Sequence, residues 1–300
     1  MKDLTPYKSL FAPDAEVRAQ ENTITAISLL NGDPVTNTKA RSGGISARIY
    51  KNGSWGFASA PGYSDDAMHR VLESARNNAI FLDSKKKGSA ITLPSFPGKG
   101  IFHYAKPSTR TQAELMEFVK TLDSYIAEKY PTLTSRTVTL NQLCIEKNII
   151  TTDGCDYSGY NPRCNLMISM SGIRDGKPVS ERQVLGGLGV FEMLFSEPSA
   201  LYPVVDELYE ALQRKINGVY AEKGMKTCIL DADLAGILAH EAIGHTVESD
   251  LVIAGSVARN YMNKKAAAEC VTLVDFAHTA FGKTCPIPIP VDDEGTEVRD

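Results

Sequence analysis

Residues 45–58 read Ile-Ser-Ala-Arg-Ile-Tyr-Lys-Asn-Gly-Ser-Trp-Gly-Phe-Ala, and this stretch indicates the fold class. Apolar and polar residues alternate over Ile45–Tyr50, and a second strand-like run follows over Ser54–Ala58. Between the two runs lies Asn52-Gly53, a pair that favours a type I′ turn because both of its central residues need a positive φ. The stretch therefore predicts an antiparallel hairpin.

More strands are predicted on either side of this hairpin. Thr23–Leu30 alternates in the same way and ends at a turn signal, Asn31-Gly32-Asp33-Pro34. Later in the chain, Thr137–Thr152 is strand-like, and the runs Cys164–Ile173 and Lys177–Leu185 are separated by Asp175-Gly176, another hairpin signal. Closely spaced strands joined by tight turns predict an antiparallel sheet.

Helical periodicity interrupts the strands at three places. A helix is predicted from Ser64 to Ser84, and another begins at the capping box formed by Thr111 and Glu114. A third is predicted to open at Pro198. The apolar stripes of the first two helices comprise Ala67, Met68, Val71, Leu72, Ala75 and Ala79, and Leu115, Phe118, Val119, Leu122 and Ile126. Since no strand–helix–strand alternation is sustained, residues 1–220 are predicted to form an α+β domain, an antiparallel sheet with helices on one face.

Composition excludes several classes of protein. The 300 residues are 43% apolar and 23% charged with a net charge of −4, which excludes collagen, coiled coils and wholesale disorder. We expect a cytoplasmic protein, because neither a signal-peptide run nor a membrane-length apolar stretch is found. The slight excess of acidic residues argues against direct nucleic-acid binding. The six cysteines lack metal-site or disulfide-scaffold spacing, so most are expected to be reduced core residues.

Two of the five histidines lie close together in one apolar segment. Residues 234–245 read Leu-Ala-Gly-Ile-Leu-Ala-His-Glu-Ala-Ile-Gly-His. A buried strand is predicted just before, over Thr227–Leu230, with Asp231 or Asp233 as the cap of the helix. The pattern His-Glu-x-x-x-His is similar to the zinc-protease motif His-Glu-x-x-His, in which both imidazoles bind one ion.

The spacing between His240 and His245 requires a distorted helix. Residues five apart in an ideal α-helix lie about 140° apart around the axis and cannot share an ion. A π-bulge or an unwound last turn would bring them together, and Gly244 can best absorb the irregular dihedral angles. The alternative is that His240 is a core histidine and His245 a cation at the helix C-terminus.

A longer resemblance extends beyond this motif. The segment Gly236–Asp250 closely resembles the one that defines the TldD/PmbA family, metallopeptidases also called modulators of DNA gyrase. Arg48–Ser59 is similar to the N-terminal hairpin of that family, Thr152-Asp153-Gly154 to its mid-domain turn, and Val291–Thr296 to its acidic segment beyond the metal helix. These landmarks follow the order of the family from about residue 40 to the end.

The resemblance implies a role for each residue of the motif. His240 and His245 would bind zinc, and Glu241 would act as the general base. Residues 221–300 would be the start of a β-rich metallopeptidase domain, which we expect to lack the C-terminal portion that supplies a cysteine ligand in the family. Five residues of this chain could instead provide the third ligand, and their spacing favours none of them: Glu248, Asp250, Cys270, His278 and Cys285.

The resemblance also implies a function. The chain is expected to be a zinc metallopeptidase that cleaves peptides or unfolded proteins, as a homodimer or as a heterodimer with a PmbA-type subunit. The alternative is a non-catalytic partner subunit, or an inactive fragment, of such a complex. Direct binding of DNA or gyrase is a third possibility, but no basic face interleaved with aromatic residues supports it.

Overall fold

The computed structural model describes residues 3–85 and 95–300, which form two compact units. The first, here called the sheet unit, comprises the described residues up to Gly218 together with Ala277–Arg299. The second, here called the helical unit, comprises Val219–Phe276 and the last residue, Asp300. The division into domains at residues 220 and 221 stays a prediction, and residues 277–299 lie with the sheet unit.

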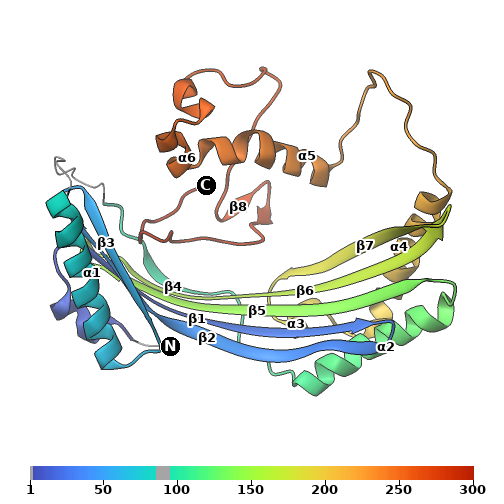
Figure 1. Ribbon diagram of the computed structural model, residues 1–300, viewed down its shortest axis with the longest axis horizontal. Coiled ribbons are helices and arrows are strands. Elements are labelled where there is room, and N and C mark those ends of the chain that lie inside the picture. The colour runs from blue at the N-terminus through green and yellow to red at the C-terminus, as the bar shows by residue number, and fades with distance from the viewer. Residues whose placement is uncertain (1–2, 86–94) are drawn as a thin grey trace. The chain divides into compact units, whose positions relative to one another are not determined.

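A seven-stranded sheet is the framework of the sheet unit (Figure 1). Its strands are β1 (Ala15–Leu30), β2 (Asp33–Lys51), β3 (Ser54–Pro61), β4 (Lys99–His103), β5 (Ser135–Thr151), β6 (Asp156–Arg174) and β7 (Lys177–Leu188). They are ordered β3-β2-β1-β5-β6-β4, and β7 also pairs with β6. Every pairing is antiparallel except the short parallel one between β4 and β6. The predicted antiparallel sheet is confirmed.

The predicted turns have the expected backbone geometry. Asn52 and Gly53 have φ angles of 47° and 87°, and Asp175 and Gly176 have φ angles of 50° and 73°. These positive values are why Asn, Asp and Gly occupy the turns. Strand β1 is longer than predicted, because the alternation already begins at Ala15.

The long helices α1 (Asp65–Lys85), α2 (Gln112–Lys129) and α4 (Tyr202–Asn217) cover one face of the sheet (Figure 1). The predicted stripes of α1 and α2 are buried. Helix α1 packs on Val17 and Ile45, whereas α2 and α4 pack in a second cluster that includes Ile27 and Leu166. Since Val17 and Ile27 are both odd-numbered residues of β1, the two clusters lie on the same face. This confirms the prediction of helices on one face.

The predicted start of α2 is also confirmed, and so is the opening of a third helical segment at Pro198. Thr111 and Glu114 form a capping box in which each side chain accepts a hydrogen bond from the other residue's backbone. The first turn of this segment, Pro198–Leu201, is 3₁₀-helical and continues directly into α4, which begins at Tyr202 with Pro203 in its first turn. Proline fits the first turn of either helix type, because it lacks the N–H that would stay unpaired there.

The shorter elements complete the chain. The sheet unit contains a 3₁₀ turn at Thr5–Leu10, helix α3 (Phe191–Leu194), and the strands β8 (Thr279–Ala280) and β9 (Lys283–Thr284). The helical unit contains α5 (Ala232–Ala239), a π-helical turn at His240–Gly244, a 3₁₀ turn at His245–Val247, α6 (Ser249–Ala254) and a 3₁₀ turn at Val257–Tyr261. No helix among the described residues is long and apolar enough to span a membrane.

The predicted strand at Thr227–Leu230 is wrong. These residues are exposed and belong to neither a helix nor a strand, and Ile229 is 96% exposed. An apolar run becomes a strand only where a neighbouring strand can accept its backbone hydrogen bonds, and within the described part of the chain it pairs with none.

The acidic segment Val291–Thr296 lies against the sheet face opposite the helices. Asp293 contacts Arg18 and Lys147, each at 3.1 Å, and Glu294 contacts Arg48 at 3.0 Å. Val291 is buried in a small apolar cluster with Ile149, Cys155 and Tyr157. The end of the chain is therefore fastened to the sheet both by ion pairs and by apolar packing.

Candidate metal centre

Helix α5 carries the two histidines and changes geometry where they begin. The helix starts at the Asp231 cap, whose Oδ1 accepts a hydrogen bond of 2.8 Å from the backbone N–H of Leu234. From His240 to Gly244 the turn is π-helical, and the N–H of His245 donates to the carbonyl of His240, five residues back. The predicted break in the regular hydrogen-bond ladder is confirmed.

The widened turn brings the predicted site residues together. The ring centroids of His240 and His245 are 4.4 Å apart. Ligand atoms of His240, Glu241 and His245 all lie within 4.8 Å of one another. Imidazole nitrogens are donors that zinc accepts at about 2.0–2.1 Å, and the carboxylate beside them can accept a proton. The donor set therefore fits zinc.

Glu248 contacts His245 in a way that the sequence did not predict. Its Oε1 lies 2.5 Å from Nδ1 of His245, whereas Oε2 of Glu241 lies 3.9 Å from Nε2 of the same ring. The hydrogen bond to Glu248, and secondarily the charges of Glu248 and Glu241, raise the pKa of His245. A carboxylate on Nδ1 keeps the proton there and leaves Nε2 free to bind a metal.

The segment after the histidines is braced by its own hydrogen bonds. The Thr246 hydroxyl donates to the carbonyl of Ile243 at 2.8 Å, and the Ser256 hydroxyl donates to the carbonyl of Thr246 at 2.6 Å. The N–H of Val252 donates to the carbonyl of Glu248 at 2.8 Å. These contacts hold the backbone of Glu248 close to the turn that carries His245.

The remaining candidate ligands have other partners or stand apart. Within the described part of the helical unit, Asp250 and Cys270 do not join the three-residue group, and Asp250 accepts a hydrogen bond from the N–H of Leu251. His278 and Cys285 belong to the sheet unit. There Nε2 of His278 lies 2.9 Å from the carbonyl oxygen of Val298, and the thiol of Cys285 donates to the carbonyl of Ile287 at 3.4 Å.

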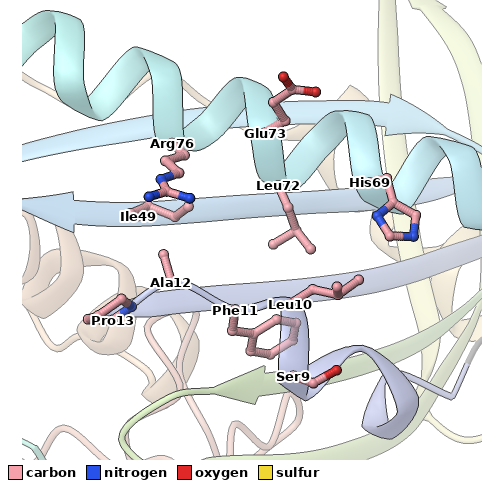
Figure 2. Close-up of a pocket in the computed structure, with 10 residues that line it drawn as sticks. All are labelled: Ser9, Leu10, Phe11, Ala12, Pro13, Ile49, His69, Leu72, Glu73 and Arg76. Carbon is pink, nitrogen blue, oxygen red and sulfur yellow. The ribbon is translucent and has the colours of Figure 1, made fainter.

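The sheet unit contains a separate pocket of about 460 Å³, which holds none of the predicted site residues (Figure 2). One wall is helix α1 and the other is residues 9–13. In Figure 2, His69 and Arg76 extend from the helix toward the pocket, whereas the carboxylate of Glu73, which also lines the pocket, points away. The pocket residues His69, Leu72 and Arg76 are spaced three and four residues apart along α1, and this spacing is the sequence signal that could have indicated a shared helix face.

Family models match both ends of the chain. A model described as PmbA/TldA metallopeptidase domain 1 matches residues 15–79, and one described as the PmbA/TldA metallopeptidase C-terminal domain matches residues 223–300. The second match contains His240, Glu241 and His245 together with the acidic segment.

Curated relatives carry metalloprotease names. A metalloprotease of Archaeoglobus fulgidus is 24% identical, over 95% of this chain and 63% of that protein. A metalloprotease of Methanothermobacter thermautotrophicus is 27% identical, over 87% of this chain and 56% of that protein. A zinc metalloprotease TldD homolog of Saccharolobus solfataricus is 23% identical, over 86% and 55%. The chain thus spans little more than half the length of these relatives.

Solved structures share the fold. A putative modulator of DNA gyrase from Bacteroides thetaiotaomicron matches with a TM-score of 0.76 and 17% identity, over 98% of this chain and 66% of that chain. TldE from Thermococcus kodakarensis matches with a TM-score of 0.68 and 15% identity, over 99% and 65%. At these identities the likeness shows the fold alone.

Proposed function

The chain belongs to the PmbA/TldD metallopeptidase family, and from this premise we propose that it is a zinc-dependent metallopeptidase that cleaves peptide bonds in peptides or unfolded proteins. One observation carries the proposal. The π-helical turn brings two histidines five residues apart, and the glutamate between them, within 4.8 Å of one another. Since regular α-helical geometry would separate these imidazoles, the turn gives the motif the geometry of a metal centre.

Each residue of the centre has a proposed role. His240 and His245 hold the ion through imidazole nitrogens. Glu248 contacts Nδ1 of His245 and so orients the ring with Nε2 toward the ion. Zinc, when bound, supplies a Lewis acid that polarises the scissile carbonyl. Glu241 accepts the proton of the attacking water and then delivers it to the leaving amine. Its side chain is 64% exposed, so water and substrate can reach the carboxylate.

A third protein ligand is needed for tight binding. Catalytic zinc sites usually have three protein ligands and one open position. We propose that a cysteine from the C-terminal portion of the family completes the site in the whole protein. For the 300-residue chain alone we expect little or no bound zinc, because two histidines form a weak site.

The proposal is tested on this chain and on a C-terminally extended version. Zinc content and cleavage of casein or an unstructured peptide are measured for wild type, Glu241→Gln, His240→Ala and the control Glu269→Gln, an exposed glutamate of the same unit. In the extended version, Glu241→Gln should retain zinc and lose about 10²–10⁴-fold in rate, because an amide cannot accept the proton. His240→Ala should also lose the metal, and Glu269→Gln should resemble wild type.

Two outcomes would contradict the proposal. Cleavage by Glu241→Gln at nearly the wild-type rate would exclude this residue as the base. Tight stoichiometric zinc in the 300-residue chain would mean that another of its residues completes the site, and variants of Glu248, Asp250, Cys270, His278 and Cys285 would identify it.

A non-catalytic subunit of a TldD/PmbA-type complex is the second candidate function. It is favoured by the likeness in fold to TldE and by the exposed apolar side chains beside the histidines. Under this alternative the extended version would bind zinc without cleaving peptides, and adding a PmbA-type or TldD-type partner would produce cleavage. Sedimentation of the extended version, alone and mixed, would distinguish a homodimer from a heterodimer. We propose a cytoplasmic location for either form.

A further inference from the structure

The apolar alternation on the helix-covered face of the sheet is interrupted at mid-length. Along β1, the inward residue Ala19 belongs to the cluster under α1, and Ile27 belongs to the cluster under α2 and α4. Between these two clusters, the same face of β1 carries Glu21, Thr23 and Thr25. A strand facing a continuous core would carry apolar residues there, so this break in the pattern needs an explanation.

The neighbouring strands are polar at the same level. Thr25 lies opposite Lys39 of β2 and Gln142 of β5. Thr23 lies opposite Arg41 and Cys144 on the same two strands. Register therefore aligns six residues across three strands, here called the polar belt: Thr23, Thr25, Lys39, Arg41, Gln142 and Cys144. The belt separates the two apolar clusters.

The polar belt forms the floor of a cavity of about 160 Å³. Ser108 and Arg110, from the segment before α2, contribute to the opposite wall. Thr25 and Gln142 are only 5% and 6% exposed, so their polar atoms are sheltered from bulk water. A buried polar group without a partner costs free energy, and native structures usually supply a partner from protein, water or a ligand.

Two of these buried groups have unused hydrogen-bonding capacity. Gln142 accepts a hydrogen bond of 2.8 Å from the N–H of Phe191 through Oε1, but its amide nitrogen donates to no other described residue. The Thr25 hydroxyl likewise makes no side-chain hydrogen bond within the described residues. An amide nitrogen can only donate hydrogen bonds, and a hydroxyl can also donate one. The cavity therefore suits a ligand with hydrogen-bond acceptor atoms.

The charges around the cavity narrow the class of ligand. Arg41 pairs with Glu21 at 3.2 Å, and Arg110 pairs with Glu114 at 3.1 Å. Lys39 forms no ion pair within the described part of the chain, so its ammonium group is available to a ligand, while the carboxylate of Glu146 in the same lining balances its charge. Glu146, which also lines the cavity, disfavours a ligand with two negative charges.

We propose that the polar belt binds a small monocarboxylate, whose oxygens accept hydrogen bonds from Lys39, Gln142 and Thr25. The cavity has the volume of about five liquid-water molecules, which suits acetate or a small amino acid. The site lies wholly in the sheet unit and is independent of zinc and of peptide cleavage.

Binding is tested with three probes on the full 300-residue chain at constant ionic strength: sodium acetate, alanine and inorganic phosphate. Calorimetry measures affinity, and amide NMR spectra of the labelled protein locate the site. Acetate and alanine should bind saturably and shift the resonances of Thr23, Thr25 and Lys39. Phosphate should bind more weakly, because Glu146 repels its second negative charge.

Matched variants assign the binding to the belt. Lys39→Gln should weaken acetate binding at least tenfold by removing the charged donor. Thr25→Val, which keeps the side-chain shape, should weaken it several-fold. The controls are Lys51→Gln, at the exposed end of the same strand, and Thr38→Val, an exposed threonine on the opposite face of β2. Both controls should bind like wild type, and urea unfolding should establish that all four variants are folded.

Three results would overturn the proposal. The first is that no probe binds saturably to the wild-type chain. The second is that Lys39→Gln and wild type bind acetate equally, which would indicate that water alone fills the cavity. The third is that phosphate binds more tightly than acetate, which would exclude the monocarboxylate class. If a variant fails to fold, the wild-type resonance shifts still decide whether the belt is the site.

Discussion

Helices α1 and α5 both carry apolar residues at helical spacing, yet only α1 buries them. The stripe of α1, which includes Met68, Val71 and Ala75, is covered by the sheet. In α5, Leu234, Ile237 and Leu238 are 50%, 57% and 55% exposed. Most helical stability in proteins comes from packing an apolar face, so α1 is held by the sheet unit, whereas α5 lacks a comparable core.

This difference in burial between α1 and α5 indicates that the two units have different roles. The sheet unit completes its own apolar core. The helical unit carries the candidate metal centre on a helix whose apolar residues remain exposed. Exposed apolar patches around a functional site are typical of surfaces that contact another protein surface. We therefore expect mutations in the two units to affect different measurements.

The largest expected contrast is in the free energy of unfolding. Leu166→Ala, in the fully buried core, should lower it by about 2–5 kcal/mol, because it removes buried methyl groups and leaves a cavity. Leu238→Ala, on exposed α5, should change it by less than about 0.5 kcal/mol. Urea unfolding followed by circular dichroism measures both. Equal losses would mean that α5 packs as firmly as the sheet.

A smaller effect is expected from pH, again in the sheet unit. Burial raises the pKa of Glu16 to about 7, against the opposing attraction of Arg48. The folded state thus holds the proton of Glu16 more tightly than the unfolded state does. The protonated side chain therefore contributes to the free energy of unfolding in full below about pH 4.5, and this contribution is lost as pH rises through 7.

The change in stability from this group should reach up to about 3 kcal/mol. Glu16→Gln should flatten the fall in unfolding free energy between pH 4.5 and pH 7, as measured by urea unfolding at several pH values. A variant with the same pH profile as wild type would contradict the assignment to Glu16.

Zinc affinity is the measurement that substitutions in the helical unit are expected to change. Glu248→Ala in the extended version should weaken zinc binding by about 10–100-fold, because His245 loses the partner that fixes its ring. Glu248→Gln should fall between this variant and wild type, since its amide oxygen can still accept from Nδ1. Competition with a chromogenic chelator measures the affinity, with Glu269→Gln as the control. Unchanged affinity in Glu248→Ala would remove the positioning role.

The smallest expected contrast concerns the helix caps. Thr111→Ala removes the capping box of α2 and should lower the unfolding free energy by about 1 kcal/mol. Asp231→Ala removes the cap of α5 and should reduce helical content slightly without shifting the unfolding midpoint of the sheet unit. A shift of that midpoint by Asp231→Ala would show that the two units unfold together.

Local signals predicted much of the sheet unit from sequence. Asn52-Gly53 and Asp175-Gly176 specify turns because few other residues tolerate their φ angles, and the stripe of α1 follows from its own periodicity. Prediction failed at Thr227–Leu230, because an apolar run does not reveal whether a partner strand exists.

The candidate centre was predictable only in part. The spacing of His240 and His245 required a distorted helix, and a π-helical turn is found there. The contact of Glu248 with His245 was not foreseen, because it depends on the 3₁₀ turn that follows. The polar belt was also missed, since it becomes visible only when the register of β1, β2 and β5 aligns residues far apart in the chain.

The return of residues 277–299 to the sheet makes the helical unit an insertion within a closed loop. The chain leaves the sheet unit at Gly218 and re-enters it at Ala277. The entropy of closing such a loop grows only with the logarithm of its length, so doubling the insertion would cost about 0.6 kcal/mol. The length of the loop therefore has little effect on the stability of the closed arrangement, while the ion pairs of Asp293 and Glu294 keep the re-entering segment attached to the sheet.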